Sequence, residues 1–123
     1  SGLLTGKFNK ATTFEKDDHR FFNRNGEAFD KGETFSGIDY NLGLKAVEEL
    51  KQVFNTNESL AHKALQWILM FNEVSCVIPG ASSVEQVLSN INTYNAKSIS
   101  DIEMQKVNAI YTKYIKKQVH HLW

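Results

Sequence analysis

The sequence predicts a mainly helical fold that contains one short buried strand. Four segments repeat apolar residues at intervals of three and four, the period of an α-helix with one buried face: residues 40–54, 60–71, 83–94 and 101–117. A single short run, residues 74–78, is rich in β-branched residues and is closed by Pro79. With 123 residues, of which 41% are hydrophobic, the chain has the usual size for one core, and a second independent core is not expected.

Charge and cysteine usage exclude several classes of function. Lys plus Arg and Asp plus Glu both number 14, so no net field concentrates nucleic acid or an anionic membrane at the surface. We therefore expect neither a nucleic-acid partner nor a membrane partner. The single Cys76 has no intrachain partner, and no stretch has the pattern of a signal peptide or a membrane span. These features favour a reducing, cytoplasmic location.

Residues 1–38 predict one long loop that precedes the helices. They hold five of the seven glycines and many charges, and they lack a sustained apolar period. Ordered loops of this length are commonly lids or binding loops, and a flexible tail is the alternative. We therefore divide the chain into a lid-like segment, residues 1–38, and a helical part, residues 39–123.

The first two predicted helices differ in how they are recognised. Residues 40–54 place an apolar stripe opposite their charges: Leu44, Val47, Leu50 and Phe54. Residues 60–71 follow Ser59, whose hydroxyl suits a helix N-cap. Their apolar residues predict a helix that is almost wholly buried on one side: Leu60, Ala64, Leu65, Trp67 and Ile68.

The strand 74–78 is followed by two further helices that begin with the same device. A serine with a glutamate three residues later forms a possible capping box at Ser82 with Glu85 and again at Ser100 with Glu103. The first of these helices should bury Val84, Val87, Leu88 and Ile91, and the second should bury Ile102, Val107, Ile110, Tyr111, Tyr114 and Ile115.

The turn between strand and helix is the strongest candidate for a binding site. The first backbone amides of a helix have no partner within it, so such an end attracts anions. Gly80 lets the backbone approach a ligand, and the hydroxyls of Ser82 and Ser83 can donate to phosphate. Gln86 and Asn90 lie four apart on one helical face, which could therefore hold a phosphate and a polar ring together. The alternative is an ordinary strand-to-helix turn with Ser82 as the N-cap.

These residues resemble a known family. The run 77–86, Val-Ile-Pro-Gly-Ala-Ser-Ser-Val-Glu-Gln, continued by Asn90, resembles the segment of aldo-keto reductases that holds the adenosine 2′-phosphate and adenine of the cofactor. The opening run, residues 1–7, resembles the family's loop that folds over the nicotinamide cofactor and its pyrophosphate. Similarity extends to further segments, so that it covers nearly the whole chain: residues 18–35, 64–67 and 119–123.

The resemblance implies an NADP site with contacts from both parts of the chain. From the helical part it implies Gly80, Ser82, Gln86 and Asn90, with Ser89 as a secondary candidate between them. From the loop it implies Ser1, Leu3, Lys7 near the phosphates, and Arg20 at the 2′-phosphate, with Arg24 as the competitor of Arg20. A guanidinium fork suits a phosphate better than a hydroxyl does. The turn 81–83 is uncharged where other members place Arg or Lys; NADP is still favoured over NAD.

The same resemblance implies that the catalytic residues are missing. In this family a tyrosine donates a proton to the carbonyl, supported by a lysine, an aspartate and a histidine on early strands and their loops, and none of those segments is present here. The tyrosines of this chain lie in helical or flanking settings and should pack with the hydroxyl at the surface: Tyr40, Tyr94, Tyr111 and Tyr114. The adjacent His120 and His121 diverge and have no ligand at metal-site spacing, so they are interpreted as tail residues. No catalytic residue and no metal ligand is predicted.

The family fold is a TIM barrel, which needs about 250 residues for its eight strands. We therefore expect this chain to supply roughly the last third of a barrel. Ser1 falls inside the cofactor loop, which suggests an upstream part, although a processed initiator methionine would also fit. The expected function is NADP binding within an enzyme that reduces aldehydes or ketones, with no activity of the chain alone. The alternative is a non-catalytic helical interaction module derived from a reductase. The expected partners are the cofactor, a small carbonyl substrate, and either a second copy or the missing N-terminal part.

Overall fold

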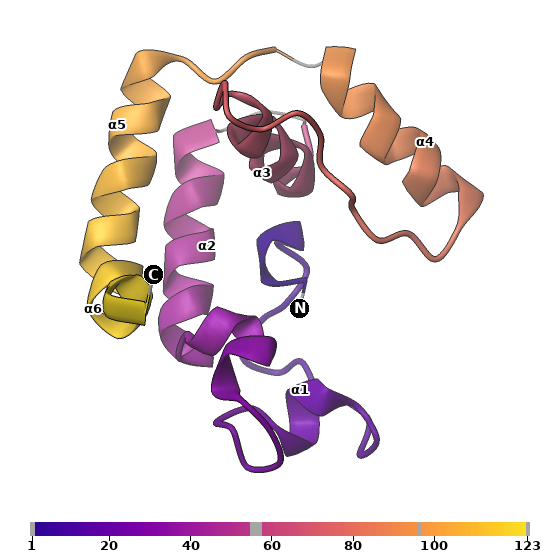
Figure 1. The fold of residues 1–123 in the computed structure, drawn as a ribbon, viewed down its shortest axis with the longest axis vertical. Helices are drawn as coiled ribbons and strands as arrows, with labels where there is room; N and C mark the ends of the chain where they lie inside the picture. Colours follow the sequence, from indigo (N-terminus) through magenta and orange to yellow (C-terminus); the bar gives the residue numbers. More distant parts are fainter. Residues whose placement is uncertain (1, 55–57, 96, 123) are drawn as a thin grey trace.

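The computed structural model describes residues 2–54, 58–95 and 97–122. Its longer helices are α2 (Tyr40–Phe54), α3 (Leu60–Leu69), α4 (Val84–Asn92) and α5 (Asp101–Ile110), and α5 continues through the π-helical turn Tyr111–Ile115 into α6 (Lys116–Val119). Helix α5 lies alongside α2, and α4 stands apart at the end of an extended arm (Figure 1). None of the helices in the described ranges combines the length and hydropathy that a membrane span requires.

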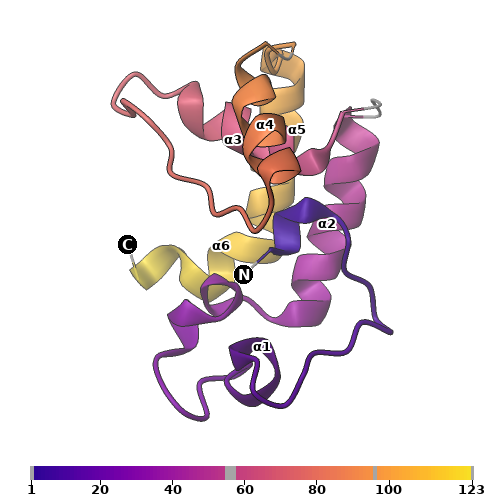
Figure 2. The same ribbon diagram turned by 90° about the vertical axis from the view of Figure 1, so that its right-hand side faces the viewer.

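The N-terminal segment is mostly irregular, and it is packed against the end of α2. It contains the short helix α1 (His19–Phe22) and three 3₁₀ turns, of which η1 (Leu3–Thr5) is the first. Asn23 and Thr34 are 0% exposed and hold the segment together, because the Asn23 Oδ1 accepts from two backbone amides at 2.8 Å and its Nδ2 donates to Thr34 Oγ1 at 3.2 Å. Figures 1 and 2 both place α1 at the end of α2 opposite to α3. Residues 2–38 therefore form an internally bonded loop.

The core is built on one face of α2. One cluster contains Val47, Phe54, Leu60 and Ile99, and a second contains Phe35, Tyr40 and Leu44. Leu3 packs against both clusters. It reaches α2 because residue 43 is glycine: a Cβ there would lie 2.6 Å from Leu3 Cδ2.

Two of the three predicted helix caps are confirmed. Ser59 is the N-cap of α3, with its hydroxyl accepting from the Ala61 amide at 3.2 Å. Ser100 and Glu103 form the predicted capping box, in which the Ser100 amide donates to the Glu103 carboxylate at 2.7 Å. Both caps use residues within one turn, so the sequence alone is enough to specify them.

The third predicted cap is wrong by one residue. Ser83, not Ser82, is the N-cap of α4 and accepts from the Gln86 amide at 3.3 Å. The Gln86 side chain reaches back and accepts from the Ser82 amide at 2.8 Å. Ser83 and Gln86 have the same three-residue spacing as Ser82 and Glu85, so the capping-box pattern alone did not distinguish the two registers.

The predicted buried strand 74–78 is also wrong. Residues 74–80 are irregular, the described part of the chain contains no strand, and Ile78 is 94% exposed. A β-branched run becomes a strand only when a second segment completes its backbone hydrogen bonds. No described segment pairs with residues 74–78, which instead form the extended connection between α3 and α4 (Figure 1).

Burial of the remaining helices differs from the predicted stripes. In α3 the deeply buried side chains include Lys63, 2% exposed, and Gln66, 8% exposed, while of the predicted apolar stripe only Leu60 is buried. The Lys63 ammonium is satisfied there because it pairs with Glu58 and donates to the carbonyl of Lys97 at 2.8 Å.

The apolar stripe of α4 is exposed, against the prediction. Val84, Val87, Leu88 and Ile91 are 47% to 70% exposed, because the arm holds α4 away from α2 and α5. The stripe of the last helix is only partly buried: Ile110 is 6% exposed, and Ile102 is 66% exposed. The helices predicted from the period of apolar residues are therefore confirmed. The structure differs from the prediction in how far each apolar stripe is buried by other elements.

Replacing Val47 should test where the core lies. Val47 is 1% exposed and Val84 is 70% exposed, so Val47→Ala should lower the free energy of unfolding by about 2 kcal/mol through lost burial and a cavity. The matched change Val84→Ala should cost less than about 0.5 kcal/mol. Urea denaturation followed by circular dichroism measures both, and an equal loss at the two positions would contradict the exposed placement of α4.

Candidate functional site

The first part of the candidate site is the turn 79–83 together with the start of α4. Ser82 and Gln86 lie together there, because the Ser82 amide and hydroxyl both donate to Gln86 Oε1, at 2.8 and 3.2 Å. Asn90 lies one helical turn further on and is half-buried. Residues 80–88 are all exposed, and a Cβ at Gly80 would meet nothing within 4 Å. The turn is therefore open to a ligand.

The N-terminal end of α4 already stabilises a negative charge. The pKa of Glu85 is lowered, first by a hydrogen bond from its own backbone amide and then by one from the Ser83 hydroxyl. Both donors belong to the first turn of α4, where the helix dipole is positive. The same donors have the chemistry that a phosphate oxygen needs.

Ser89 lies between Gln86 and Asn90 and makes a contact within the protein. Its Oγ is 2.7 Å from Nε2 of His62 on α3. Together with a bond from the Gln66 side chain to the carbonyl of Thr93 at 3.4 Å, this contact links the α4 region to α3. Ser89 therefore has a structural partner in this chain.

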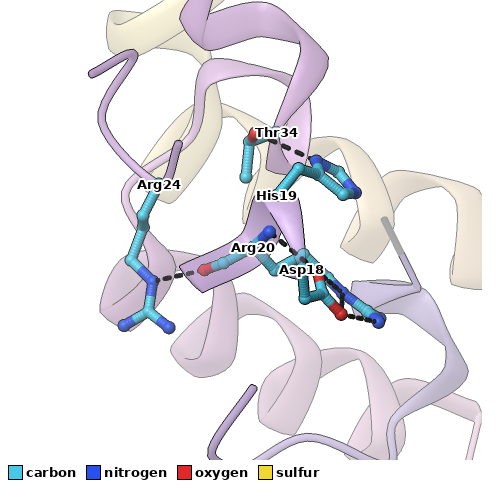
Figure 3. Close-up of polar contacts among 5 residues, drawn as sticks. All are labelled: Asp18, His19, Arg20, Arg24 and Thr34. Atoms are coloured by element: carbon cyan, nitrogen blue, oxygen red, sulfur yellow. Dashed lines mark hydrogen bonds and ion pairs between the residues drawn. The ribbon is translucent and has the colours of Figure 1, made fainter. Parts of the chain in front are cut away.

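The second part of the candidate site surrounds Arg20 in α1. Asp18 is the N-cap of α1 and accepts from the Arg20 amide at 2.8 Å. The same carboxylate accepts from the Arg20 guanidinium, from Nε at 2.9 and 3.0 Å and from Nη2 at 2.5 Å (Figure 3). The hydrogen bond from the Arg20 side chain is the main cause that lowers the pKa of Asp18 to about 2. Arg20 is thus held by a fully ionised, bidentate partner at neutral pH.

Arg24 lies four residues after Arg20, beyond the end of α1, and is held differently. Its Nε donates to the carbonyl of Arg20 at 3.2 Å, and its guanidinium carbon is 4.8 Å from the Tyr40 ring centroid. No carboxylate in the described ranges forms an ion pair with it. Figure 3 shows its two terminal nitrogens pointing away from Asp18.

The other predicted contacts of the N-terminal segment are placed as follows. Leu3 lies in the core, so its side chain is committed to packing. Lys7 is exposed, and its backbone amide donates to Thr5 Oγ1 at 3.3 Å. Ser1 lies outside the described residues. Both views separate α1 from α4 (Figures 1 and 2).

The four tyrosines and the two terminal histidines form no site of their own. Tyr40 donates to the carbonyl of Asn9 at 3.0 Å, Tyr114 donates to the Glu49 carboxylate at 2.6 Å, and Tyr94 is 89% exposed. The Tyr111 hydroxyl is 2.8 Å from Nδ1 of His120. Among the described residues, no group of three His, Cys, Asp or Glu side chains could hold a metal ion.

Sequence reasoning missed Asp18 as part of the site. The available signal was its spacing to Arg20, since an aspartate that caps a helix can reach an arginine two residues later. The same spacing indicates that Arg20 can form an ion pair with a neighbouring aspartate, and no aspartate stands at that spacing before Arg24.

Comparison with known proteins gives one consistent result. A model described as the aldo/keto reductase family matches residues 1–112. The L-glyceraldehyde 3-phosphate reductases of Escherichia coli K12 and O157:H7 are each 29% identical over 107 residues, which is 87% of this chain and 30% of theirs. The solved glycerol dehydrogenase of Gluconobacter oxydans is similar with a TM-score of 0.69 and 29% identity, over 93% of this chain and 32% of that one. The chain therefore spans about a third of the length of these relatives.

Replacing Arg20 should release the pKa of Asp18. With Arg20→Gln the carboxylate keeps its backbone donor and loses the guanidinium, so its pKa should rise from about 2 toward 3.8. Because the folded pKa is depressed, the pair stabilises the folded chain above the ordinary pKa, and this stability is lost as pH falls from about 4 toward 2. A carbon-13 NMR titration of the Asp18 carboxyl measures the shift, with Arg24→Gln as the control. An unchanged titration in Arg20→Gln would show that the ion pair does not form.

Proposed function

Since this chain belongs to the aldo/keto reductase family, we propose that it is the NADP-binding C-terminal part of an enzyme that reduces aldehydes or ketones. The observation that supports this most directly is the exposed turn before α4, which carries two serine hydroxyls and the first amides of the helix, donors of the kind that a phosphate accepts. The relatives agree in reaction class, since one is named a reductase of a phosphorylated aldehyde and another a dehydrogenase of glycerol.

The proposed cofactor contacts follow the two parts of the site. At the α4 turn they are Gly80, Ser82, Gln86 and Asn90, with Ser89 beside them; in the N-terminal segment they are Ser1, Leu3, Lys7 and Arg20. The donor set fits NADP, because hydroxyls, helix amides and a guanidinium all donate to phosphate oxygens, and an amide such as that of Asn90 can pair with a purine edge. The cofactor would supply the hydride, and this chain would hold its adenosine end.

Two rearrangements accompany cofactor binding in this proposal. Gln86 would exchange its bond with Ser82 for one to the cofactor, since a single Oε1 now accepts both Ser82 donors. The α4 turn and α1 would be brought to one ligand, since they are separate in this chain. The first change breaks exposed polar contacts, each of which costs about 0.5 to 1.5 kcal/mol.

The exposed face of α4 supports a role within a larger barrel. In the proposed enzyme, the remaining part of a family barrel covers this face. The support is the apolar stripe of α4 and the 94% exposure of Ile78, together with the 30% of the relatives' length that this chain matches. The alternative, a non-catalytic helical interaction module, would use the same face for another protein. Recovery of carbonyl reduction when the catalytic strands are supplied distinguishes the two.

The chain by itself should not reduce carbonyl compounds. The hydroxyls of Tyr40 and Tyr114 are bonded to Asn9 and Glu49, and that of Tyr111 lies beside His120. We expect no NADPH oxidation above background with a panel of aldehydes and ketones, measured by absorbance. Turnover that is lost in Tyr114→Phe would contradict this expectation and would identify a proton donor within the chain.

Removing the Ser82 hydroxyl should weaken NADP binding. In a protein that joins this chain to the catalytic strands of the family, Ser82→Ala should cost about 0.5 to 1.5 kcal/mol, the usual worth of one neutral hydrogen bond. Arg20→Ala should cost more, because its bond to phosphate is charge-assisted. Calorimetric titration with NADP measures both, and the exposed Ser98, which lies outside the turn, provides the control Ser98→Ala. Unchanged affinity in both variants would remove these residues from the site.

A further inference from the structure

Three successive residues of the turn before α2 have left-handed backbone conformations. In the 3₁₀ turn η3 (Phe35–Gly37), φ is 50° at Phe35, 55° at Ser36 and 74° at Gly37. Glycine adopts such angles freely, whereas a residue with a Cβ is strained there. Ser36 is exposed, so its own side chain gains no burial that would offset the strain. Such a residue keeps this conformation only where the contacts on both sides fix it.

The start of the turn is fixed by burial. Thr34 is 0% exposed, and Phe35 is 4% exposed within the core cluster at the beginning of α2. The Thr34 Oγ1 lies 3.2 Å from His19 Nδ1 (Figure 3) and accepts from Asn23 Nδ2 at 3.2 Å. Residues 19–34 therefore form one internally bonded unit, which contains α1 and reaches α2 through the turn.

The end of the turn is held by α6. The Gln118 Oε1 accepts from the Asp39 backbone amide at 2.8 Å, and its Nε2 donates to the carbonyl of Tyr114 at 2.7 Å. Val119 is 4% exposed, and a Cβ on Gly37 would lie 3.7 Å from Val119 Cγ1. Figure 2 shows α6 beside the turn that precedes α2. We name Gln118 and Val119 the C-terminal latch.

We infer that the C-terminal latch keeps the turn η3 in its left-handed conformation, and that the unit 19–34 hinges at Ser36 when the latch is released. Strain at Ser36 favours release and the contacts of Gln118 and Val119 oppose it, so the balance between the two states depends on the latch. The latch goes beyond the proposed function, since none of the proposed cofactor contacts lies in α6. Only one consequence rests on that function: the latch would set how Arg20 is presented to the cofactor.

The test is amide hydrogen exchange of the full 123-residue chain without ligand, followed by NMR. The Gly37 and Ile38 amides donate to carbonyls three residues earlier at 3.1 and 3.2 Å, so they report on the turn and not on the bond of Gln118 itself. Gln118→Ala should lower their protection by about twofold to tenfold, the factor that one neutral hydrogen bond corresponds to. Gln105→Ala, the same change at an exposed position of α5, should leave it unchanged.

Two further readouts separate hinging from unfolding. The two backbone amides that donate to Asn23 Oδ1 within the unit 19–34 should keep their protection in Gln118→Ala. The guanidinium carbon of Arg24 lies 4.8 Å from the ring centroid of Tyr40, the first residue of α2. The side-chain signals of Arg24 should therefore lose part of their ring-current shift in Gln118→Ala, because hinging carries the unit away from α2.

The strain in the turn is tested by replacing Ser36. Ser36→Gly should raise the protection of the Gly37 and Ile38 amides by about twofold to fivefold, because glycine removes the cost of the left-handed φ and gives back part of it as chain entropy. Combined with Gln118→Ala, it should restore their protection toward that of the unchanged chain.

Each other outcome overturns the inference. Unchanged protection of the two turn amides in Gln118→Ala, or an equal loss in Gln105→Ala, would show that Gln118 is not a latch. An equal loss at the amides bonded to Asn23 would show unfolding of the unit, and an unchanged shift of Arg24 would show that the unit does not move. Lower protection in Ser36→Gly, or no restoration in the double variant, would show that the turn is not strained. All of these results leave the proposed NADP site standing, because no cofactor is present in the measurement.

Discussion

Burial of one face of α2 is the constraint on which the rest of the structure depends. Val47 is 1% exposed at the centre of one cluster, and Leu44 belongs to the other. Leu3 packs against both because Gly43 leaves room for it, which ties the N-terminal segment to the helices. Dispersion and hydrophobic burial grow with the apolar contacts formed, so this face holds together the elements that pack against it. The apolar residues of α4 are exposed, and α4 lies outside the core.

The separation of α4 from that core explains how the candidate site is divided. The α4 turn supplies the hydroxyl and amide donors, and α1 supplies the guanidinium groups, each held by its own local hydrogen bonds. Only the His62 to Ser89 contact and the Gln66 to Thr93 bond link the α4 region to α3 among the described side-chain hydrogen bonds. A few polar contacts constrain a helix far less than an apolar face does, so the position of α4 depends on what covers Leu88 and its neighbours.

Both places at which the proposed function puts phosphate contain a carboxylate of the protein. Asp18 fills the fork of Arg20, and Glu85 accepts from the first donors of α4. The two carboxylates have lowered pKa values for the same reason, since hydrogen-bond donors stabilise the ionised form. In the proposed function, phosphate binding would therefore exchange one anion for another, and its strength would be the difference between two charge-assisted interactions.

The sequence by itself determined the helices, two of their caps and the identity of the candidate donors. Ser59 and the pair Ser100 and Glu103 are correct because their hydrogen bonds close within one turn. The resemblance of residues 77–86 predicts cofactor contacts at the α4 turn, where Ser82 and Gln86 are hydrogen-bonded to each other, and those contacts stay a prediction. Tertiary structure alone decided that residues 74–78 are not a strand, that α4 is exposed and that Arg20 is paired while Arg24 is not. A strand forms only when a neighbouring strand completes its backbone hydrogen bonds, and an apolar stripe is buried only when another element packs against it. The sequence of the segment itself does not identify either neighbour.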